Sequence, residues 1–213
     1  MKCYSDPILL MRAGIALALI LPLGLLAACG GSAPKSATLA PDAVVLAFGD
    51  SITFGTGAGA NQGYPAVLAS LIGRKVESAG VPGETSAAGL ARLPQMLDYY
   101  QPQLVIICEG GNDFLRKLAQ KQTAENIRAM VRTARSKGVA ALLVAVPKPG
   151  LLPSPPDFYE EIASDFAIPL EAAALKKILR DNELKSDLVH PNAKGYAELA
   201  RSLAEVLKKS GAI

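Results

Sequence analysis

Short apolar runs, separated by turn residues, recur along the chain after residue 43. The clearest are residues 44–48, 104–108 and 139–146, with weaker segments at 75–78 and 168–170. Apolar runs of four to eight residues between turn signals are typical of strands buried on both faces of a parallel sheet. The pattern therefore predicts five strands, the last of them at a sheet edge because Pro169 cannot donate a ladder hydrogen bond.

Segments with helical periodicity lie between these strands. Apolar positions repeat with the helical period over residues 64–72, 86–97, 123–134 and 196–207. We expect Thr123 and Asn192 to cap the last two helices, and we expect Pro94 to break the second helix into two pieces. Alternating strands and helices predict an α/β sandwich around a parallel sheet.

Composition and charge narrow the class of protein. Half of the 213 residues are hydrophobic and only 5% are aromatic, with no Trp, so Ala, Leu and Val must build the core. The formal net charge is only +3 and no concentrated basic face is evident; Lys208 and Lys209 are interpreted as the solvated end of a helix. This balance argues against nucleic acid as the main partner.

The first 41 residues have the features of a targeting segment. Lys2 and Arg12 precede the uncharged apolar run 13–27, which is shorter than the ~20 residues of a membrane span and typical of a signal peptide. It ends in Leu-Ala-Ala-Cys, with Cys29 last, which resembles the lipobox of bacterial lipoproteins. We therefore expect a lipoprotein signal peptide at 1–28, a lipidated Cys29 followed by a flexible tether at 29–41, and one domain at 42–213. Two alternatives to a lipoprotein signal are an ordinary secretory signal with an incidental Cys and an uncleaved anchor.

The predicted lipid would hold the protein on a bacterial cell envelope, since several acyl chains together give stable membrane anchoring. Gly30, rather than Asp, after Cys29 favours the outer membrane, facing the periplasm, if the cell is Gram-negative. Cys108 lies alone in an apolar run and is predicted to be a buried structural thiol, so the mature domain has no disulfide available.

Polar or glycine-rich segments directly follow three of the predicted strands. They are Gly-Asp-Ser-Ile-Thr-Phe-Gly at 49–55, Gly-Val-Pro-Gly-Glu-Thr at 80–85 and Glu-Gly-Gly-Asn-Asp at 109–113. The carboxyl ends of parallel strands meet at one edge of a sheet, where ligands bind. Ser51 is a candidate nucleophile there, although the G-x-S-x-G elbow of ordinary α/β-hydrolases is absent.

His190 is the only histidine of the chain, so any imidazole-based mechanism must use it. Asp187 lies three residues earlier, and one turn would bring its carboxylate to the imidazole Nδ1, fixing the tautomer. Taken singly, such residues are more often turn or cap residues. Taken together, they supply the nucleophile, base, orienting acid and hydrogen-bond donors that acyl transfer needs.

The four segments GDSITFG, GVPGET, GGND and DLVHPN, in this order, resemble the four sequence blocks of the SGNH/GDSL hydrolases. The resemblance covers residues 43–209 and is greatest to the bacterial arylesterases and the periplasmic thioesterase/lysophospholipase. It implies a flavodoxin-like three-layer α/β/α sandwich with a five-stranded parallel sheet in the order 2-1-3-4-5. One departure is Ser78-Ala79, where many relatives have Asn.

The resemblance also implies the role of each site residue. Ser51 is expected to be the nucleophile, His190 the general base and then acid, and Asp187 the orienting acid. The backbone N–H groups of Ser51 and Gly83 and the side chain of Asn112 are expected to form the oxyanion hole.

The expected activity is a serine esterase for aryl, short-to-medium acyl or lysophospholipid esters, or for thioesters. No metal or cofactor is expected, and we expect a monomer whose partners are a small-molecule or lipid ester and the membrane. Loops 56–63 and 147–156 are predicted to shape the acyl pocket. Two alternatives stay open: a carbohydrate O-acetyl esterase acting on envelope polysaccharide, and a non-catalytic lipoprotein that binds a ligand.

Overall fold

The computed structural model describes residues 36–213. The predicted signal peptide, Cys29 and residues 30–35 of the predicted tether lie outside the described residues. Within the described part, no helix is both long and apolar enough to cross a membrane.

A parallel five-stranded sheet forms the centre of the domain. Its strands lie in the spatial order β2-β1-β3-β4-β5, as predicted for a flavodoxin-like sheet. Their bounds are β1 Val44–Gly49, β2 Lys75–Gly80, β3 Leu104–Cys108, β4 Ala140–Val144 and β5 Leu170–Glu171. The fifth strand is shorter than the predicted apolar segment at 168–170 and begins at its end, because Pro169 lacks the N–H that a longer ladder would need.

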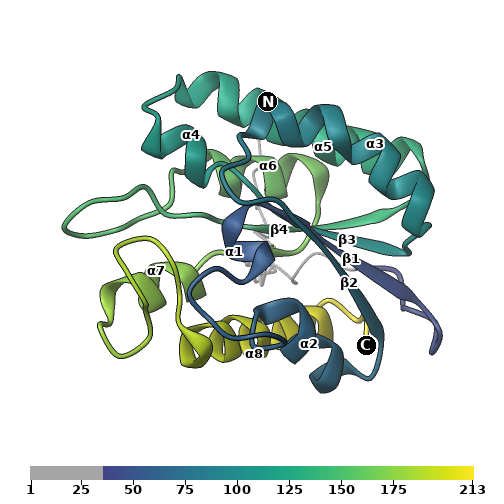
Figure 1. The fold of residues 1–213 in the computed structure, drawn as a ribbon. Coiled ribbons are helices and arrows are strands. Elements are labelled where there is room, and N and C mark those ends of the chain that lie inside the picture. The colour runs from purple at the N-terminus through teal and green to yellow at the C-terminus, as the bar shows by residue number, and fades with distance from the viewer. Residues whose placement is uncertain (1–35) are drawn as a thin grey trace, which may run out of the picture. The chain divides into compact units, whose positions relative to one another are not determined.

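Helices cover both faces of this sheet (Figure 1), which confirms the three-layer α/β/α architecture. One face carries α3 Ser86–Tyr100, α4 Gly111–Leu115, α5 Gln120–Ser136 and α6 Phe158–Phe166. The other carries α2 Tyr64–Ile72, α7 Ala174–Arg180 and α8 Ala193–Lys209. The short helix α1, Ser51–Phe54, continues from the end of β1.

The core lies between the sheet and these two helical layers. Because both faces of the sheet are covered, every residue of β3 and nearly every residue of β1 and β4 is buried. These strands are built from Val, Leu, Ile and Ala, which explains why their sequences read as continuous apolar runs rather than as alternating ones. Cys108 is a buried free thiol at the end of β3, as predicted.

The predicted break at Pro94 is wrong. Helix α3 runs through Pro94 from Ser86 to Tyr100. Leu93 and Leu97 lie on its buried face, one immediately before and one three residues after the proline. We attribute the continuity to this packing, which holds the turns on both sides of the proline in place although Pro94 cannot donate an intrahelical hydrogen bond.

The two predicted helix caps differ in outcome. Asn192 caps α8, accepting a hydrogen bond from the N–H of Gly195 at 3.1 Å. Thr123 is not a cap, because α5 begins at Gln120. The Thr123 hydroxyl is buried and donates instead to Asp113 Oδ1 at 3.2 Å, a tertiary contact that the sequence pattern did not reveal.

Part of the predicted flexible tether is bound to the domain. The N–H of Ser36 donates to Ser210 O at 2.9 Å, and the N–H of Leu39 donates to Ala212 O at 2.8 Å. The Leu39 side chain is only 3% exposed and belongs to the hydrophobic core. Residues 36–41 therefore extend the folded domain rather than the tether.

Replacing Leu39 by Ala tests this attachment. We expect Leu39→Ala to lower the free energy of unfolding by about 2–5 kcal/mol, because it removes a buried side chain and leaves a cavity. Denaturant unfolding measures the change, with Ala37→Ser at an exposed neighbouring position as the control. Equal stability of the two variants would mean that this segment is a free tether.

Candidate active site

The register of the sheet brings three chain segments to one level. Gly49, the last residue of β1, pairs with Gly80 of β2 on one side and with Cys108 of β3 on the other. A Cβ atom at Gly49 would lie 2.2 Å from the carbonyl oxygen of Cys108, so only glycine fits at this level. The segments that follow the three strands therefore start side by side at the carboxyl edge of the sheet.

Ser51 is the first residue of α1, so its N–H has no acceptor within the helix. Asp50 caps this helix, accepting a hydrogen bond from the N–H of Ile52 at 2.9 Å. The Ser51 hydroxyl oxygen lies 2.9 Å from Nε2 of His190, although the two residues are 139 positions apart in the chain. The structure thus brings together the predicted nucleophile and the predicted base.

Asp187 lies on the other side of the imidazole. Its Oδ2 is 2.7 Å from His190 Nδ1, and its Oδ1 accepts hydrogen bonds of 2.8 Å from the N–H groups of Val189 and His190. Partial burial acts to raise the pKa of Asp187, but the hydrogen bonds from the imidazole and from these two N–H groups outweigh it and lower the pKa. An ionised carboxylate at Nδ1 holds the ring proton there, which leaves Nε2 as the acceptor facing Ser51.

Asn112 lies in α4 and is fixed by the buried carboxyl of Asp50. The Asn112 side-chain amide donates to Asp50 Oδ2 at 3.0 Å. An amide NH₂ has two hydrogens, so this contact orients the group and leaves its second hydrogen for a ligand. Burial raises the pKa of Asp50 to about 6, although the hydrogen bonds from Ile52 and Asn112 favour its charged form.

The loop that carries Gly83 is held from both sides. Gly83 has a left-handed φ of 80°, and its carbonyl oxygen accepts a hydrogen bond of 2.8 Å from the Arg116 guanidinium. The next residue, Glu84, forms a two-pronged ion pair with Arg92 at 2.8 and 2.6 Å, and the Arg92 guanidinium lies over the Phe48 ring. The roles of these two arginines are not predictable from the sequence, because basic residues eight or more positions away from a loop give no local signal of contact with it.

Asp113 ties the helices around this edge together. Its two oxygens accept hydrogen bonds from the N–H and the hydroxyl of Ser86, at 2.8 and 2.6 Å, as well as from Thr123. Asp113 thereby joins the start of α3 to α4 and α5, and it fixes the position of the neighbouring Asn112.

Glu109 is a fully buried acid behind the site. Neither of its carboxyl oxygens has a hydrogen-bond donor among the described residues. Burial, together with the nearby negative charges of Asp50 and Glu84, raises the pKa of Glu109 well above its usual range. Burial therefore favours the neutral form of the Glu109 carboxyl.

A mainly apolar pocket of about 210 Å³ opens at this edge. Four of the predicted site residues line it, namely Ser51, Gly83, Asn112 and His190, while Asp187 lies behind the imidazole. Its apolar walls include Ile52, Leu115, Val146, Leu179 and Leu188, with Pro82, Pro147, Pro149 and Pro153.

The two loops predicted to shape this pocket contribute unequally. The proline-rich loop supplies three prolines to the wall, as expected. Of loop 56–63 only Thr56 reaches the pocket, so the prediction for the rest of that loop is wrong. The carbonyl of Thr56 accepts a hydrogen bond from the Tyr196 hydroxyl at 2.7 Å, and Gly57 packs against Ser186, which turns the loop away.

Comparison with known proteins identifies the family. A sequence model described as the GDSL-like lipase/acylhydrolase family matches residues 47–198, which include most of the site. The chain belongs to this family. The description of this family is that of lipases and acylhydrolases.

Individual relatives of this GDSL hydrolase support the assignment. Esterase TesA of Pseudomonas aeruginosa is 39% identical over 110 residues, 49% of this chain and 55% of that enzyme, so the match spans about half of the relative's length. Thioesterase 1/protease 1/lysophospholipase L1 of Escherichia coli K12 is 29% identical over 172 residues, 77% of this chain and 83% of that enzyme.

Solved structures agree in fold. The crystal structure of TesA superposes with a TM-score of 0.70 at 30% identity, covering 78% of this chain and 99% of that one. AlinE4, an SGNH-hydrolase family esterase, gives a TM-score of 0.63 at 29% identity, covering 81% and 98%. In residues 36–213 of the present chain, no group of three or more His, Cys, Asp or Glu is arranged to hold a metal ion.

The raised pKa of Glu109 has a measurable consequence. A raised pKa in the folded state means that the stabilising contribution is full below the pKa of the unfolded chain and is lost as pH rises. We therefore expect Glu109→Gln, whose side chain is uncharged at every pH, to raise the melting temperature at pH 8 and to have little effect near pH 4.

Thermal unfolding over this pH range measures the effect. Glu125→Gln, on the exposed face of α5, is the matched control and should not change the pH profile. A destabilised Glu109→Gln variant at pH 8 would show that Glu109 is ionised in the folded protein.

Proposed function

We propose that this GDSL hydrolase is a serine esterase that cleaves carboxylic esters or thioesters by two-step acyl transfer. The observation that carries the proposal is the unbroken chain of contacts from Asp187 through His190 to Ser51, at 2.7 and 2.9 Å, which ends at an apolar pocket. A hydroxyl, an imidazole and a carboxylate in this order can activate the hydroxyl as a nucleophile.

In the first step, Ser51 Oγ attacks the carbonyl carbon of the substrate while His190 Nε2 takes the hydroxyl proton. The positive charge that develops on the imidazole is stabilised by the ionised Asp187. The same imidazole then gives the proton to the departing alcohol or thiol, and an acyl-Ser51 ester is left.

The negative charge on the carbonyl oxygen needs donors that are already in place. The N–H groups of Ser51 and Gly83 and the free hydrogen of the Asn112 amide are the candidates, and all three residues line the pocket. Two of these residues are held by hydrogen bonds. Asp50 accepts a hydrogen bond from the Asn112 amide, and Arg116 donates one to the carbonyl oxygen of Gly83. Donors held in this way need no reorganisation when the charge forms.

In the second step, water replaces the leaving group. His190 takes a proton from the water, whose oxygen attacks the acyl carbon, and the same donors again stabilise the oxyanion. Collapse of this intermediate returns the proton to Ser51 and frees the carboxylic acid.

The pocket is suited to an apolar acyl group. Its volume of about 210 Å³ is below the roughly 300–1,000 Å³ of pockets that enclose drug-sized ligands, and its wall is mainly aliphatic. Relatives named as esterase, arylesterase and lysophospholipase are consistent with an ester substrate.

Replacing the nucleophile is the direct test. We expect Ser51→Ala to lower kcat on short aryl esters by at least about a thousandfold and to abolish labelling by a fluorophosphonate, because no activated hydroxyl is left. Ser70→Ala, on the exposed side of α2, is the control and should keep both properties.

The same assay separates the alternatives. A non-catalytic binding protein would not react with the fluorophosphonate even as wild type. Activity confined to acetyl esters in a chain-length series would favour the carbohydrate O-acetyl esterase over the proposed acyl esterase.

Asn112 should act on the transition state rather than on binding. We expect Asn112→Ala to lower kcat by about 10²–10³-fold, which corresponds to about 2.7–4 kcal/mol, with little change in KM. Steady-state kinetics measure the effect, with Asn182→Ala in an exposed loop as the control. Full kcat in Asn112→Ala would remove this side chain from the oxyanion hole.

A further inference from the structure

Large apolar side chains surround the mouth of the pocket and face solvent. Leu151, Leu152 and Leu188 are 97%, 73% and 80% exposed, and two leucines from the α4 side are about half exposed. Together they form what we call the leucine rim, which consists of Leu115, Leu118, Leu151, Leu152 and Leu188. Soluble domains rarely expose contiguous apolar surface of this kind unless it binds something.

Leucines of the rim belong to chain segments that line the pocket. Leu115 and Leu188 line the pocket directly, from α4 and from the loop before His190. Pro149 and Pro153 also line it, and Leu151 and Leu152 lie between them at the tip of the proline-rich loop. Whatever covers the rim therefore also covers the entrance.

The proline-rich loop is held at its base, so its tip leucines are kept outside the core. The N–H of Lys148 donates to Ser154 O at 3.0 Å in an antiparallel bridge. The Arg180 guanidinium donates to Pro153 O at 3.0 Å. These contacts fix both ends of the segment 149–153, and Figure 1 shows this loop projecting from the carboxyl edge of the sheet.

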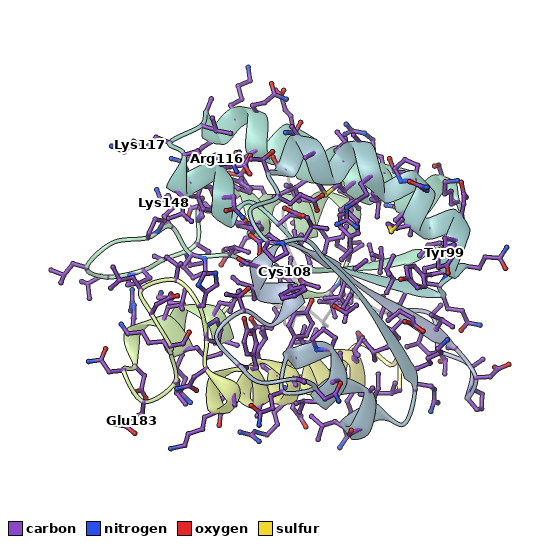
Figure 2. The ribbon with its side chains drawn as sticks, in the orientation of Figure 1. Tyr99, Cys108, Arg116, Lys117, Lys148 and Glu183 are labelled. Carbon is purple, nitrogen blue, oxygen red and sulfur yellow. The ribbon has the colours of Figure 1, made fainter. Side chains whose placement is uncertain are left out.

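Basic residues flank the leucine rim on the side of α4 and the proline-rich loop. Residues 114–124 and 147–156 contain no acidic residue, and their basic residues are Arg116, Lys117, Lys121 and Lys148. Figure 2 shows Arg116, Lys117 and Lys148 gathered around α4 and the start of the loop. Acidic residues near the mouth lie on the opposite loop, where Asp187 is bound to His190 and Glu183 lies at the far end in Figure 2.

We propose that the leucine rim and its flanking basic residues dock on the surface of an anionic lipid bilayer, with the pocket mouth facing the lipids. Exposed leucines that enter the acyl boundary next to Lys and Arg at headgroup level are the two components of interfacial binding.

Docking in this orientation would bring the pocket to lipid esters, and that part of the inference rests on the proposed esterase function. An amphiphile with its ester bond at the membrane surface would enter between the leucines and reach Ser51 without crossing water. Membrane binding itself needs no turnover, so it is testable in the Ser51→Ala variant.

The chain contains no Trp, so one introduced Trp reports its own surroundings. Leu152→Trp places the reporter on the loop tip. Tyr99→Trp is the matched control, because Tyr99 is 76% exposed at the opposite edge of the domain (Figure 2). Both are made in the full chain, so that any membrane anchor outside the described residues acts equally on the two proteins.

With phosphatidylglycerol vesicles we expect the emission of Leu152→Trp to shift to shorter wavelength and that of Tyr99→Trp to stay unchanged. Phosphatidylcholine vesicles should give a smaller shift in Leu152→Trp, and the Ser51→Ala background should not alter the result. Equal responses of the two reporters, or a shift that depends on protein concentration without vesicles, would overturn the proposal; the second outcome would assign the rim to a second copy of the chain.

Variants then separate docking from catalysis. Leu151→Ser with Leu152→Ser, and Lys117→Glu with Lys148→Glu, should each lower hydrolysis of a lysophospholipid embedded in phosphatidylglycerol vesicles at least tenfold. Both should leave hydrolysis of a soluble short aryl ester unchanged, since none of these residues lines the pocket.

Lys208→Glu with Lys209→Glu, at the solvated end of α8, reverses the same amount of charge away from the rim and should change neither activity. Equal losses on both substrates in the rim variants would point to damage of the site rather than to docking. Wild-type inactivity on every ester, with the fluorescence shift intact, would refute the esterase proposal and leave the docking surface standing.

Discussion

The in-register pairing of Gly49 with Gly80 and with Cys108 is the constraint on which the site depends. It brings the ends of β1, β2 and β3 to one level, so that the polar segments after each strand meet within reach of one ligand. The close approach of β3 to Gly49 leaves no room for a side chain there. Backbone packing in the sheet therefore sets the geometry of the site, and the side-chain contacts add to it.

Around this level, buried acids connect the segments to one another. Asp50 joins α1 to α4 through Asn112, and Asp113 joins α4 to α3 and α5. Burying carboxyls so close together is unfavourable, and the raised pKa values of Asp50 and Glu109 express that cost. In return, each charged or polar group at the sheet edge has one position, which is what preorganised donors require.

The hydrophobic pattern predicted the parallel sheet because strands that are covered on both faces have continuous apolar sequences. It did not predict α1, α4, α6 or α7, since short helices offer little periodicity to detect, although α2, with nine residues, was predicted from its apolar face. Ser51, Asp187 and His190 were predictable from their segments and from the single histidine. Arg92, Arg116 and Glu109 were not, because their roles arise from tertiary contacts and burial that no local spacing encodes.

The two sides of the pocket are built on opposite physical principles. On the sheet side, hydrogen bonds fix Ser51, His190 and Asn112, so a substitution there alters the site itself. On the solvent side, Leu151 and Leu152 project from a loop that is attached only at its base and contacts none of those groups. Changes at the rim can therefore alter the pocket entrance without disturbing the contacts among Ser51, His190 and Asp187.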